Sequence, residues 1–408
     1  MYSDSAGSPC GWESFVLESC GSSVNCGVKM MEKDELIVIG GGLVGAAIAF
    51  GAARVGVPVR VLDQGDVAFR ASRGNFGLVW VQSKGSKQPR YARWSRDAAA
   101  LWPGLASELQ ELTGVNVALQ QSGGFWLGFS ESDVQARNEL LGRLNKQVGG
   151  IPFEILDNTE LKRRLPGIGP AVVGGSFCPL DGHANPLLLL RALHAGLRAK
   201  GADVVGEVDT VGVSYDARAS LFEVCGRDGR RWRAGRVVLA AGLGNAELAP
   251  QVGLHAPVSP SRGQVLITER LKPFLAYPTN KARQTNEGSV QIGSSTEDVG
   301  LDDGTTTKTI QWMAKRAVDT FPRLASARLV RAWGALRVMT PDGFPIYDSS
   351  ASCPGAFVAT SHSGVSLAAA HAYVIGPWMA GRSAQPDDFD AFVGGRFINL
   401  QGSHANDH

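Results

Sequence analysis

The stretch ELIVIGGGLVGAAIAFGAARVGVPVRVLD, residues 35–63, decides the fold of this chain. Residues 35–39 are the short apolar run expected of a buried parallel strand, and a G-x-G-x-x-G motif at 40–45 follows without a gap. Residues 46–55 then predict a helix, and residues 59–63 predict a second strand that ends in an aspartate. Strand, glycine turn, helix, strand and acid together predict a βαβ unit that binds the ADP half of a dinucleotide.

Each glycine of the motif has its own physical role. Gly40 permits the tight turn, Gly42 lets backbone N–H groups approach the pyrophosphate, and Gly45 lets the helix pack close to the strand. Asp63 is placed to accept hydrogen bonds from the ribose hydroxyls, and its charge disfavours the 2′-phosphate of NADP. Three neighbours in the sequence are expected to contact the cofactor as well: Leu43, Val44 and Gln64.

Three further segments favour FAD over NAD. The small polar loop 71–77 directly follows the acidic strand, and its side chains can donate hydrogen bonds to the second phosphate and the ribityl chain of a longer cofactor. A strand at 236–240 runs into glycine, and a strand at 356–360 is followed by a turn and a helix that Ser361 or Ser363 can cap. The alternatives are an ordinary surface loop and one more helix of the sheet domain. These segments, with the β-rich stretch near residue 208, supply the residues expected to contact FAD: Ala71, Ser72, Asn75, Phe76, Gly77, Val208, Ala241, Gly242, Ser363, Gly364, Val365 and Ser366.

The whole chain has the composition of a folded α/β enzyme. Its 408 residues are too many for one compact unit, which predicts two domains. Forty basic and 38 acidic residues leave a formal charge of +2 with no basic block, so we expect a small-molecule partner and no nucleic acid. The six cysteines show no CxxC pair and no metal-ligand spacing, which predicts a cytoplasmic protein without a metal site. The uncharged run 36–53 is nearly long enough to span a membrane, but its glycines favour the βαβ unit and we expect no membrane span.

The order of these motifs resembles the D-amino-acid oxidase and glycine oxidase superfamily of FAD enzymes over residues 35–392. The landmarks are IGGGLVG (39–45), ASRGNFG (71–77), the region of Val208, VLAAG (238–242), and WGALRVMTPDGFPI (333–346) leading to SHSG (361–364). Within the superfamily, DGHANPLLLLR (181–191) and SHSGVSLAAAH (361–371) look most like the FAD subunits of bacterial opine oxidases and D-hydroxyproline dehydrogenases. The resemblance implies an α/β fold. A Rossmann-like FAD-binding domain of the glutathione-reductase type would carry a second, α+β substrate domain on a mostly antiparallel sheet.

Both the first and the last motif must reach one flavin, so the FAD-binding domain is expected to be discontinuous. We expect it at 31–80, 150–250 and 335–395, with the substrate or cap domain at 81–149 and 251–334. We expect residues 1–30 to be a disordered or misassigned extension and residues 396–408 to be a tail.

The resemblance also implies roles at the reactive end of the site. Arg337 matches the family position that grips a substrate carboxylate, and it is expected to contact the cofactor too. His362 is expected to contact the flavin or a second polar group of the substrate, and Arg262 to line the substrate face. His183 is a candidate for the neighbourhood of a second flavin. Each has a structural alternative, because arginines form ion pairs and histidines beside turns are often structural.

The implied activity is FAD-dependent oxidation of a secondary amine or imino acid by hydride transfer to flavin N5. The implied substrate is an opine such as octopine or nopaline, or D-hydroxyproline, and the chain would be the catalytic subunit of a multi-subunit dehydrogenase. The FAD is expected to be noncovalent, because Ser72-Arg73-Gly74 stands in the region where relatives tether it. The resemblance admits an FMN at a subunit interface and an iron–sulfur cluster only in a partner subunit, since this chain has no cysteine set to ligate one.

Two alternatives stay open. The first is a self-contained oxidase of glycine, sarcosine or D-amino acids that produces hydrogen peroxide. The second is a flavin-binding scaffold or transfer-RNA-modifying protein, for which a basic surface would be expected that the composition does not show.

Overall fold

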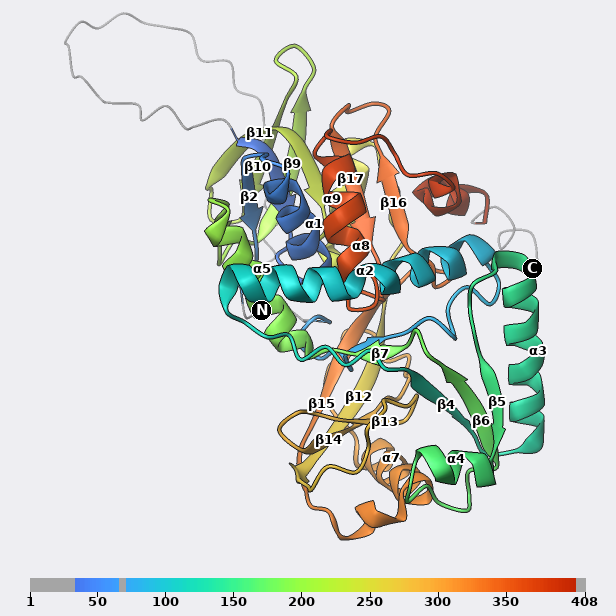
Figure 1. The fold of residues 1–408 in the computed structure, drawn as a ribbon. Coiled ribbons are helices and arrows are strands. Elements are labelled where there is room, and N and C mark those ends of the chain that lie inside the picture. The colour runs from blue at the N-terminus through green and yellow to red at the C-terminus, as the bar shows by residue number, and fades with distance from the viewer. Residues whose placement is uncertain (1–33, 66–70, 401–408) are drawn as a thin grey trace, which may run out of the picture. The chain divides into compact units, whose positions relative to one another are not determined.

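The computed structural model describes residues 34–65 and 71–400, so the extension expected at 1–30 and residues 401–408 lie outside it. In this part of the chain the main sheet has eight strands, six of which follow one another in the order β16 (Ile346–Ser349), β17 (Ala356–Thr360), β11 (Arg231–Leu239), β1 (Asp34–Ile39), β2 (Val59–Leu62) and β8 (Asp203–Val205) (Figure 1). The strands from β17 to β8 are parallel to their neighbours, and β16 is antiparallel to β17. Two antiparallel strands, β10 (Leu221–Gly226) and β9 (Thr210–Asp216), extend from β11.

Both faces of β1 are buried, which explains why its sequence is apolar without alternation. Leu36 and Val38 belong to one apolar cluster, whereas Ile37 and Ile39 belong to another. A strand covered on both faces reads as a continuous hydrophobic run, as is typical of the centre of a parallel sheet.

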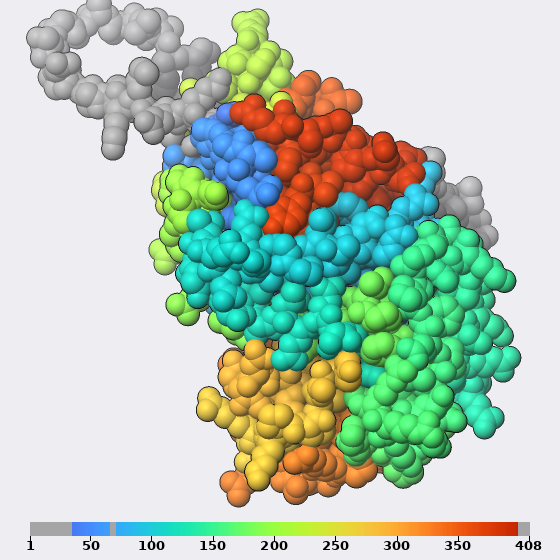
Figure 2. Space-filling view, in the orientation of Figure 1, coloured from blue at the N-terminus to red at the C-terminus, as the bar shows by residue number. Residues whose placement is uncertain are grey.

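A layer of helices packs on the face that carries Leu36 and Val38. Its members are α1 (Leu43–Arg54), α2 (Pro89–Thr113), α5 (Pro186–Ala199), α8 (Ala368–Ala370), η5 (His371–Ile375) and α9 (Gly376–Met379). Small residues let α1 lie close to its neighbours: a Cβ on Gly51 would stand 2.0 Å from the carbonyl oxygen of Ala372. In the space-filling view, α2 lies side by side with α1 and with the C-terminal segment (Figure 2).

The second part of the described chain is built on smaller antiparallel sheets. One contains β13 (Ala282–Gln284), β14 (Ser289–Gly293), β12 (Ser259–Arg270) and β15 (Leu329–Met339), in that order. Another contains β4 (Gly124–Gly128), β6 (Gly174–Cys178) and β5 (Glu154–Asp157), and β3 (Leu78–Val79) pairs with β7 (Gly182–His183). The helices α3 (Glu131–Val148), α4 (Asn158–Arg164) and α7 (Thr307–Thr320) accompany these sheets (Figure 1). The remaining short helices are η2 (Gly242–Gly244), α6 (Asn245–Leu248), η3 (Ala249–Val252), η4 (Pro322–Ser326), η6 (Phe389–Phe392) and η7 (Gly394–Leu400).

This arrangement has the predicted fold class, but packing shifts some of the expected domain limits. The helix α2, expected in the cap, buries Trp102, Leu105 and Leu109 in the cluster that α1 and α5 share. The strands β5 and β6, expected in the FAD-binding domain, pair with β4 of the cap. The expected tail begins inside η7, where Phe397 is buried against the main sheet.

The uncharged run that is long enough to suggest a membrane span is split between β1 and α1. Throughout the described residues, no helix is both long and apolar enough to cross a membrane.

Candidate functional site

The glycines of the first motif hold the N-terminal end of α1 against the edge of the sheet. Gly40 has a φ of 104°, and a Cβ there would stand 2.3 Å from the carbonyl oxygen of Ala240 on the neighbouring strand end. A Cβ on Gly45 would stand 1.9 Å from the carbonyl oxygen of Gly40. Both positions therefore exclude any side chain, as the predicted tight turn and close helix packing require.

Asp63, which follows β2, lies beside the same glycine turn. The carboxylate of Asp63 accepts hydrogen bonds from the backbone N–H of Gly41 at 2.7 Å and of Gly65 at 3.0 Å. Val208 donates its backbone N–H to the Asp63 carbonyl oxygen at 3.0 Å, so the predicted Val208 region lies next to this acid. Gln64 follows at the end of β2 and is exposed.

The other predicted cofactor segments converge on the start of α1. Ser72 accepts a hydrogen bond from the N–H of Leu43 at 2.9 Å, and a Cβ on Gly42 would stand 2.9 Å from that hydroxyl. A Cβ on Gly364 would lie 3.4 Å from Leu43 and 3.6 Å from Val44. The helix start, the 71–77 loop and the 361–366 turn thus form one cradle of small residues, which fits the pyrophosphate of a dinucleotide at a helix N-terminus.

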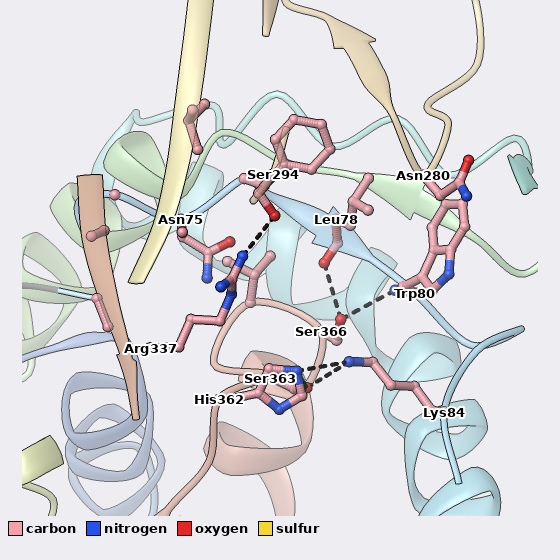
Figure 3. Close-up of a pocket in the computed structure, with 17 residues that line it drawn as sticks. Asn75, Leu78, Trp80, Lys84, Asn280, Ser294, Arg337, His362, Ser363 and Ser366 are labelled. Carbon is pink, nitrogen blue, oxygen red and sulfur yellow. Dashed lines mark hydrogen bonds between the residues drawn. The ribbon is translucent and has the colours of Figure 1, made fainter. Parts of the chain in front are cut away.

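The cradle continues into a cavity of about 240 Å³ between the main sheet and the four-stranded sheet (Figure 3). Gly74 packs against β15, where its Cβ would stand 2.1 Å from that of Ala335, and Gly242 faces Val338 on the same strand. The polar residues that line the cavity are Asn75, Lys84, Asn280, Ser294, Arg337, His362, Ser363 and Ser366. Its apolar lining includes Phe76, Leu78, Trp80, Val265 and Val365.

Arg337 reaches the cavity from β15 and is held by neutral oxygen atoms. Its Nη2 donates to the Ser294 hydroxyl at 2.7 Å and to the Ser295 carbonyl at 2.8 Å, and its Nη1 donates to the Arg262 carbonyl at 3.3 Å. Gly263 leaves room for it, because a Cβ there would stand 2.4 Å from Nη2. Burial lowers the pKa of Arg337, and the charge of Glu297 opposes that shift. Within the described residues Arg337 forms no ion pair, so its charge is available to an anion in the cavity.

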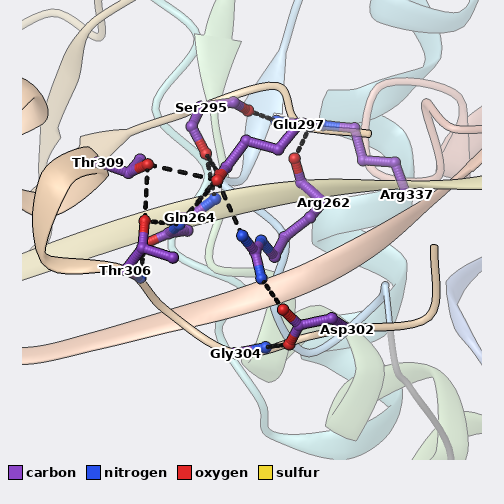
Figure 4. A network of polar contacts seen from close by, with 9 residues as sticks. All are labelled: Arg262, Gln264, Ser295, Glu297, Asp302, Gly304, Thr306, Thr309 and Arg337. Carbon is purple, nitrogen blue, oxygen red and sulfur yellow. Dashed lines mark hydrogen bonds and ion pairs between the residues drawn. The ribbon is translucent and has the colours of Figure 1, made fainter. Parts of the chain in front are cut away.

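Arg262, by contrast, is not among the residues that line the cavity. Its guanidinium pairs with Glu297 at 2.9 Å and with Asp302 at 2.5 Å, and 3% of its side chain is exposed (Figure 4). Gln264 also donates to the Glu297 carboxylate, at 3.0 Å. These ion pairs favour the structural alternative for Arg262 over the role expected at the substrate face, since the protein itself neutralises this arginine.

A cluster around Ser363 forms the other polar part of the cavity. The Ser363 hydroxyl accepts a hydrogen bond from Lys84 Nζ at 2.7 Å and shares one with the Tyr91 hydroxyl at 2.8 Å. The ring of His362 lies within 3.5 Å of Lys84 Nζ. Burial, then the charges of Lys84 and Arg337, lower the pKa of His362 well below its usual value, so its ring is neutral near pH 7.

Lys84 and Tyr91 have shifted pKa values as well. Burial lowers the pKa of Lys84 to about 8, with the charge of Asp181 acting in the opposite direction. Burial raises the pKa of Tyr91 to about 12. At neutral pH this wall of the cavity therefore presents the ammonium group of Lys84, the hydroxyl of Ser363 and the neutral imidazole of His362.

One expectation for neighbouring residues needs correction. Ser361 and Ser363 do not cap the helix that follows them, because α8 begins at Ala368 and has Leu367 at its N-cap. The hydroxyl of Ser366 is also used elsewhere, since it accepts from Trp80 N at 3.2 Å and donates to the Leu78 carbonyl at 3.0 Å. Ser363 and Ser366 thus join the 361–366 turn to the chain in and after β3, through Lys84 and through Leu78 and Trp80.

His183 lies outside the cavity lining. It is buried in β7, where its ring nitrogens lie 3.0 Å from Gln120 and 3.2 Å from Arg283. Burial and the charge of Arg283 lower its pKa to about 3, which leaves the ring neutral.

The structure brings most of the predicted residues together in two groups. Those around the start of α1 are Gly40, Gly42, Leu43, Val44, Gly45, Asp63, Ser72, Val208 and Gly364. Those in the cavity wall are Ala71, Asn75, Phe76, Arg337, His362, Ser363, Val365 and Ser366. Gly77 is buried next to Ala184, and Ala241 and Gly242 follow β11 beside the cavity strand β15.

Sequence reasoning missed several residues of the wall: Trp80, Lys84, Asn280 and Ser294. Lys84 stands in the polar run QSKGSK, which has the composition of an exposed loop, and no local pattern signals that it is drawn into a cavity. Across the part of the chain that the structure describes, no group of three or more His, Cys, Asp or Glu side chains could hold a metal ion.

Comparison with known proteins adds four findings. The sequence matches the DAO family, FAD dependent oxidoreductase, over residues 35–378. An opine oxidase subunit from Rhizobium meliloti is 40% identical over 374 residues, which cover 90% of this chain and 98% of that protein. Glycine oxidase from Bacillus licheniformis is 25% identical over 376 residues, 89% of this chain and 97% of that protein. The crystal structure of glycine oxidase from Geobacillus kaustophilus has the same fold, with a TM-score of 0.81 at 24% identity over 90% of this chain and 99% of that chain.

Proposed function

The chain belongs to the DAO family of FAD-dependent oxidoreductases, enzymes that act on the CH–NH bonds of amines and amino acids, and from this premise we propose that its substrate is an opine such as octopine or nopaline. The observation that carries the proposal is an arginine in the cavity wall, Arg337, whose charge the protein does not neutralise. Such a guanidinium binds a carboxylate with two parallel hydrogen bonds. The two relatives named as opine oxidase subunits supply the choice of opine over D-hydroxyproline, which is the second candidate substrate.

The residues of the cradle support noncovalent FAD. Gly42 has no side chain between the start of α1 and the place of a pyrophosphate, Gly45 lets α1 pack close to the strand end, and Asp63 stands beside the turn where ribose hydroxyls would need an acceptor. No cysteine lines the cavity within the described residues, which agrees with a cofactor that is bound without a thioether tether.

The chemistry that FAD supplies when bound is acceptance of a hydride, at flavin N5, from the carbon next to the substrate nitrogen. Arg337 would hold the substrate carboxylate and so fix the direction of the C–H bond. The apolar wall of Phe76, Leu78 and Trp80 excludes water, which favours the neutral amine that loses a hydride. No side-chain base is then obligatory for the oxidation itself.

We further propose that the chain works as the catalytic subunit of a cytoplasmic multi-subunit dehydrogenase. The support is that two relatives, each 40% identical over 90% of this chain, are named as subunits of an enzyme. An iron–sulfur cluster would belong to a partner subunit, and an FMN would lie at a subunit interface. The alternative, a self-contained oxidase of glycine, sarcosine or D-amino acids, is favoured by the similarity to glycine oxidase.

Anaerobic reduction of the bound flavin tests the substrate. We expect octopine or nopaline to bleach the flavin absorbance of the purified protein faster than D-hydroxyproline, proline, sarcosine or D-alanine at equal concentration. Bleaching by sarcosine or D-alanine alone would contradict the proposal.

A second measurement separates the two electron acceptors. In air, the isolated chain is expected to turn over slowly with little hydrogen peroxide. Rapid turnover with one peroxide per substrate oxidised would favour the self-contained oxidase.

A further inference from the structure

The cavity contains a second cation that the family resemblance does not assign, Lys84. We propose that Lys84 binds a second carboxylate of the substrate, so that the site selects amines with two carboxylates over amines with one. This inference rests on the proposed function, because it assumes that Arg337 binds the first carboxylate. It makes Lys84 a specificity-determining residue.

The charge of the cavity wall is the first argument. Among the described residues that line the cavity, Lys84 and Arg337 are the two cations, and there is no aspartate or glutamate. They come from different elements, since Lys84 follows β3 and Arg337 belongs to β15, and Figure 3 shows His362 and Ser363 beside Lys84 and Ser294 beside Arg337. A low-dielectric cavity with two positive charges and no negative one favours a doubly negative ligand.

The contacts of Lys84 are the second argument. Its ammonium group donates to the Ser363 hydroxyl at 2.7 Å, and its other neighbour, the His362 ring, is 3.5 Å away. Within the described chain Lys84 forms no ion pair with a carboxylate. An ammonium group carries three donors, so at least one stays available to a ligand.

The acid that acts on Lys84 through space does not neutralise it directly. Both carboxylate oxygens of Asp181 are used by the loop that precedes the lysine: they accept from Val81 N at 2.6 Å, from Gln82 N at 3.3 Å and from Gln82 Nε2 at 2.7 Å. Arg137 completes this buried network by donating to Gln82 Oε1 at 2.8 Å. Asp181 therefore fixes the loop that carries Lys84 and leaves the ammonium group without a contact partner of opposite charge.

The same loop is held at several other points. Trp80 N donates to Ser366, Trp80 Nε1 donates to Ser83 at 3.1 Å, and Lys84 N donates to the Val81 carbonyl at 2.9 Å. The backbone of Lys84 is thus ordered before any ligand binds, which lowers the entropy lost on binding. Glycine, sarcosine and D-hydroxyproline have one carboxylate and leave this ammonium group unpaired.

Two thioethers allow binding to be measured without oxidation of the ligand. In both, sulfur replaces the amine nitrogen, so neither compound can be oxidised to an imine. Thiodiacetate has two carboxylates and (methylthio)acetate has one. Their dissociation constants would be measured with the FAD-loaded protein by titration of the flavin absorbance. We expect the wild-type protein to bind thiodiacetate about 10- to 100-fold more tightly than (methylthio)acetate, as a charge-assisted hydrogen bond would provide.

The variant Lys84→Met keeps an unbranched side chain, one atom shorter, and removes its charge. It should lose the preference for thiodiacetate and leave the affinity for (methylthio)acetate unchanged, whereas Lys84→Arg should keep part of the preference. Lys87→Met is the matched control, because Lys87 belongs to the same loop, is exposed and does not line the cavity.

Several results would overturn the inference. Equal affinity of the wild-type protein for the two thioethers would overturn it. This test needs no variant, so it holds even if Lys84→Met fails to fold. Equal weakening of both ligands in Lys84→Met, or a loss of kcat with unchanged affinities, would make Lys84 a structural residue or a proton acceptor instead. The proposed function fails separately: a protein that prefers thiodiacetate but whose flavin no opine reduces has the specificity site without the activity.

Discussion

Two arginines on neighbouring strands of one sheet have opposite surroundings. In the β12–β15 ladder, Ser261 lies opposite Arg337 and Arg262 lies opposite Leu336, so the two arginines are one register step apart. Arg262 is neutralised by Glu297 and Asp302, whereas Arg337 is held by one hydroxyl and two carbonyl oxygens. The difference teaches that proximity to the cavity alone does not single out Arg337, the arginine that we propose binds the substrate. The useful property is a charge that is oriented but not cancelled.

The two regions are also connected. Backbone hydrogen bonds of 2.9 Å join Arg262 and Glu297 in both directions. The nearby Ser295 (Figure 4) and Ser294 (Figure 3) hold the Arg337 guanidinium. The paired network thus fixes the loop that orients the unpaired arginine. Substitutions around Arg337 should therefore change ligand affinity, whereas substitutions around Arg262 should change the stability of the protein.

Removal of the unpaired charge should have the largest effect. In Arg337→Met we expect the KM for an opine to rise about 100-fold or more, because one or two charge-assisted hydrogen bonds to the carboxylate are lost. FAD content should stay unchanged. Steady-state kinetics with flavin quantification measures both, and Arg331→Met serves as control because Arg331 is exposed on the same strand. An unchanged KM in Arg337→Met would remove this residue from the substrate site.

Neutralising Arg337 in place should have the next largest effect. The variant Ser294→Asp puts a carboxylate where the hydroxyl now accepts a hydrogen bond from Arg337. Arg337 would then form an ion pair within the protein, as Arg262 does. We expect the KM for an opine to rise about 10-fold or more, since the new carboxylate competes with that of the substrate. Ser294→Asn is the neutral control and should change KM much less. Equal KM values in the two variants would show that charge at this position is not what matters.

The sequence predicts the geometry of the glycine turn better than the pairing of the charged residues near the cavity, and the comparison explains why. The roles of Gly40 and Gly45 depend on contacts within one strand–turn–helix unit, so spacing alone reveals them. Whether an arginine is paired depends on a loop about 35 residues away whose position is set by the β12–β15 register, and this is why the sequence does not reveal that Arg262 forms ion pairs. Lys84 escapes sequence reasoning for the same reason, because its loop is fixed by Asp181, about 100 residues further along the chain.

The affinity for a ligand with two carboxylates is expected to depend on pH through the protonation of Lys84. A carboxylate binds the protonated form of Lys84, so affinity for thiodiacetate should be constant below pH 8, where the lysine is charged, and fall about tenfold per pH unit above it. Asp181, with a pKa raised by burial to about 7, is half ionised at pH 7 and largely ionised from pH 8 upwards, whereas Tyr91 stays protonated, His362 stays neutral and Arg337 stays charged. Titrations from pH 7 to 10 check this. A constant affinity across that range, or an equal fall for (methylthio)acetate, would contradict it.

The smallest effect on kinetics should come from the paired network. In Glu297→Gln, the amide keeps one acceptor for the groups around it but leaves Arg262 with a single carboxylate partner, Asp302. We expect the free energy of unfolding to fall by about 1–3 kcal/mol, because a buried guanidinium loses a charged hydrogen bond, and the KM for an opine to change less than about threefold. Urea unfolding and steady-state kinetics measure the two quantities. Asp302→Asn is the matched control and should leave both unchanged, since the Asp302 side chain is 61% exposed and surface ion pairs contribute little. A Glu297→Gln variant with full stability but a KM as high as that of Arg337→Met would show that the network acts on the substrate directly, and the distinction between the two arginines would fail.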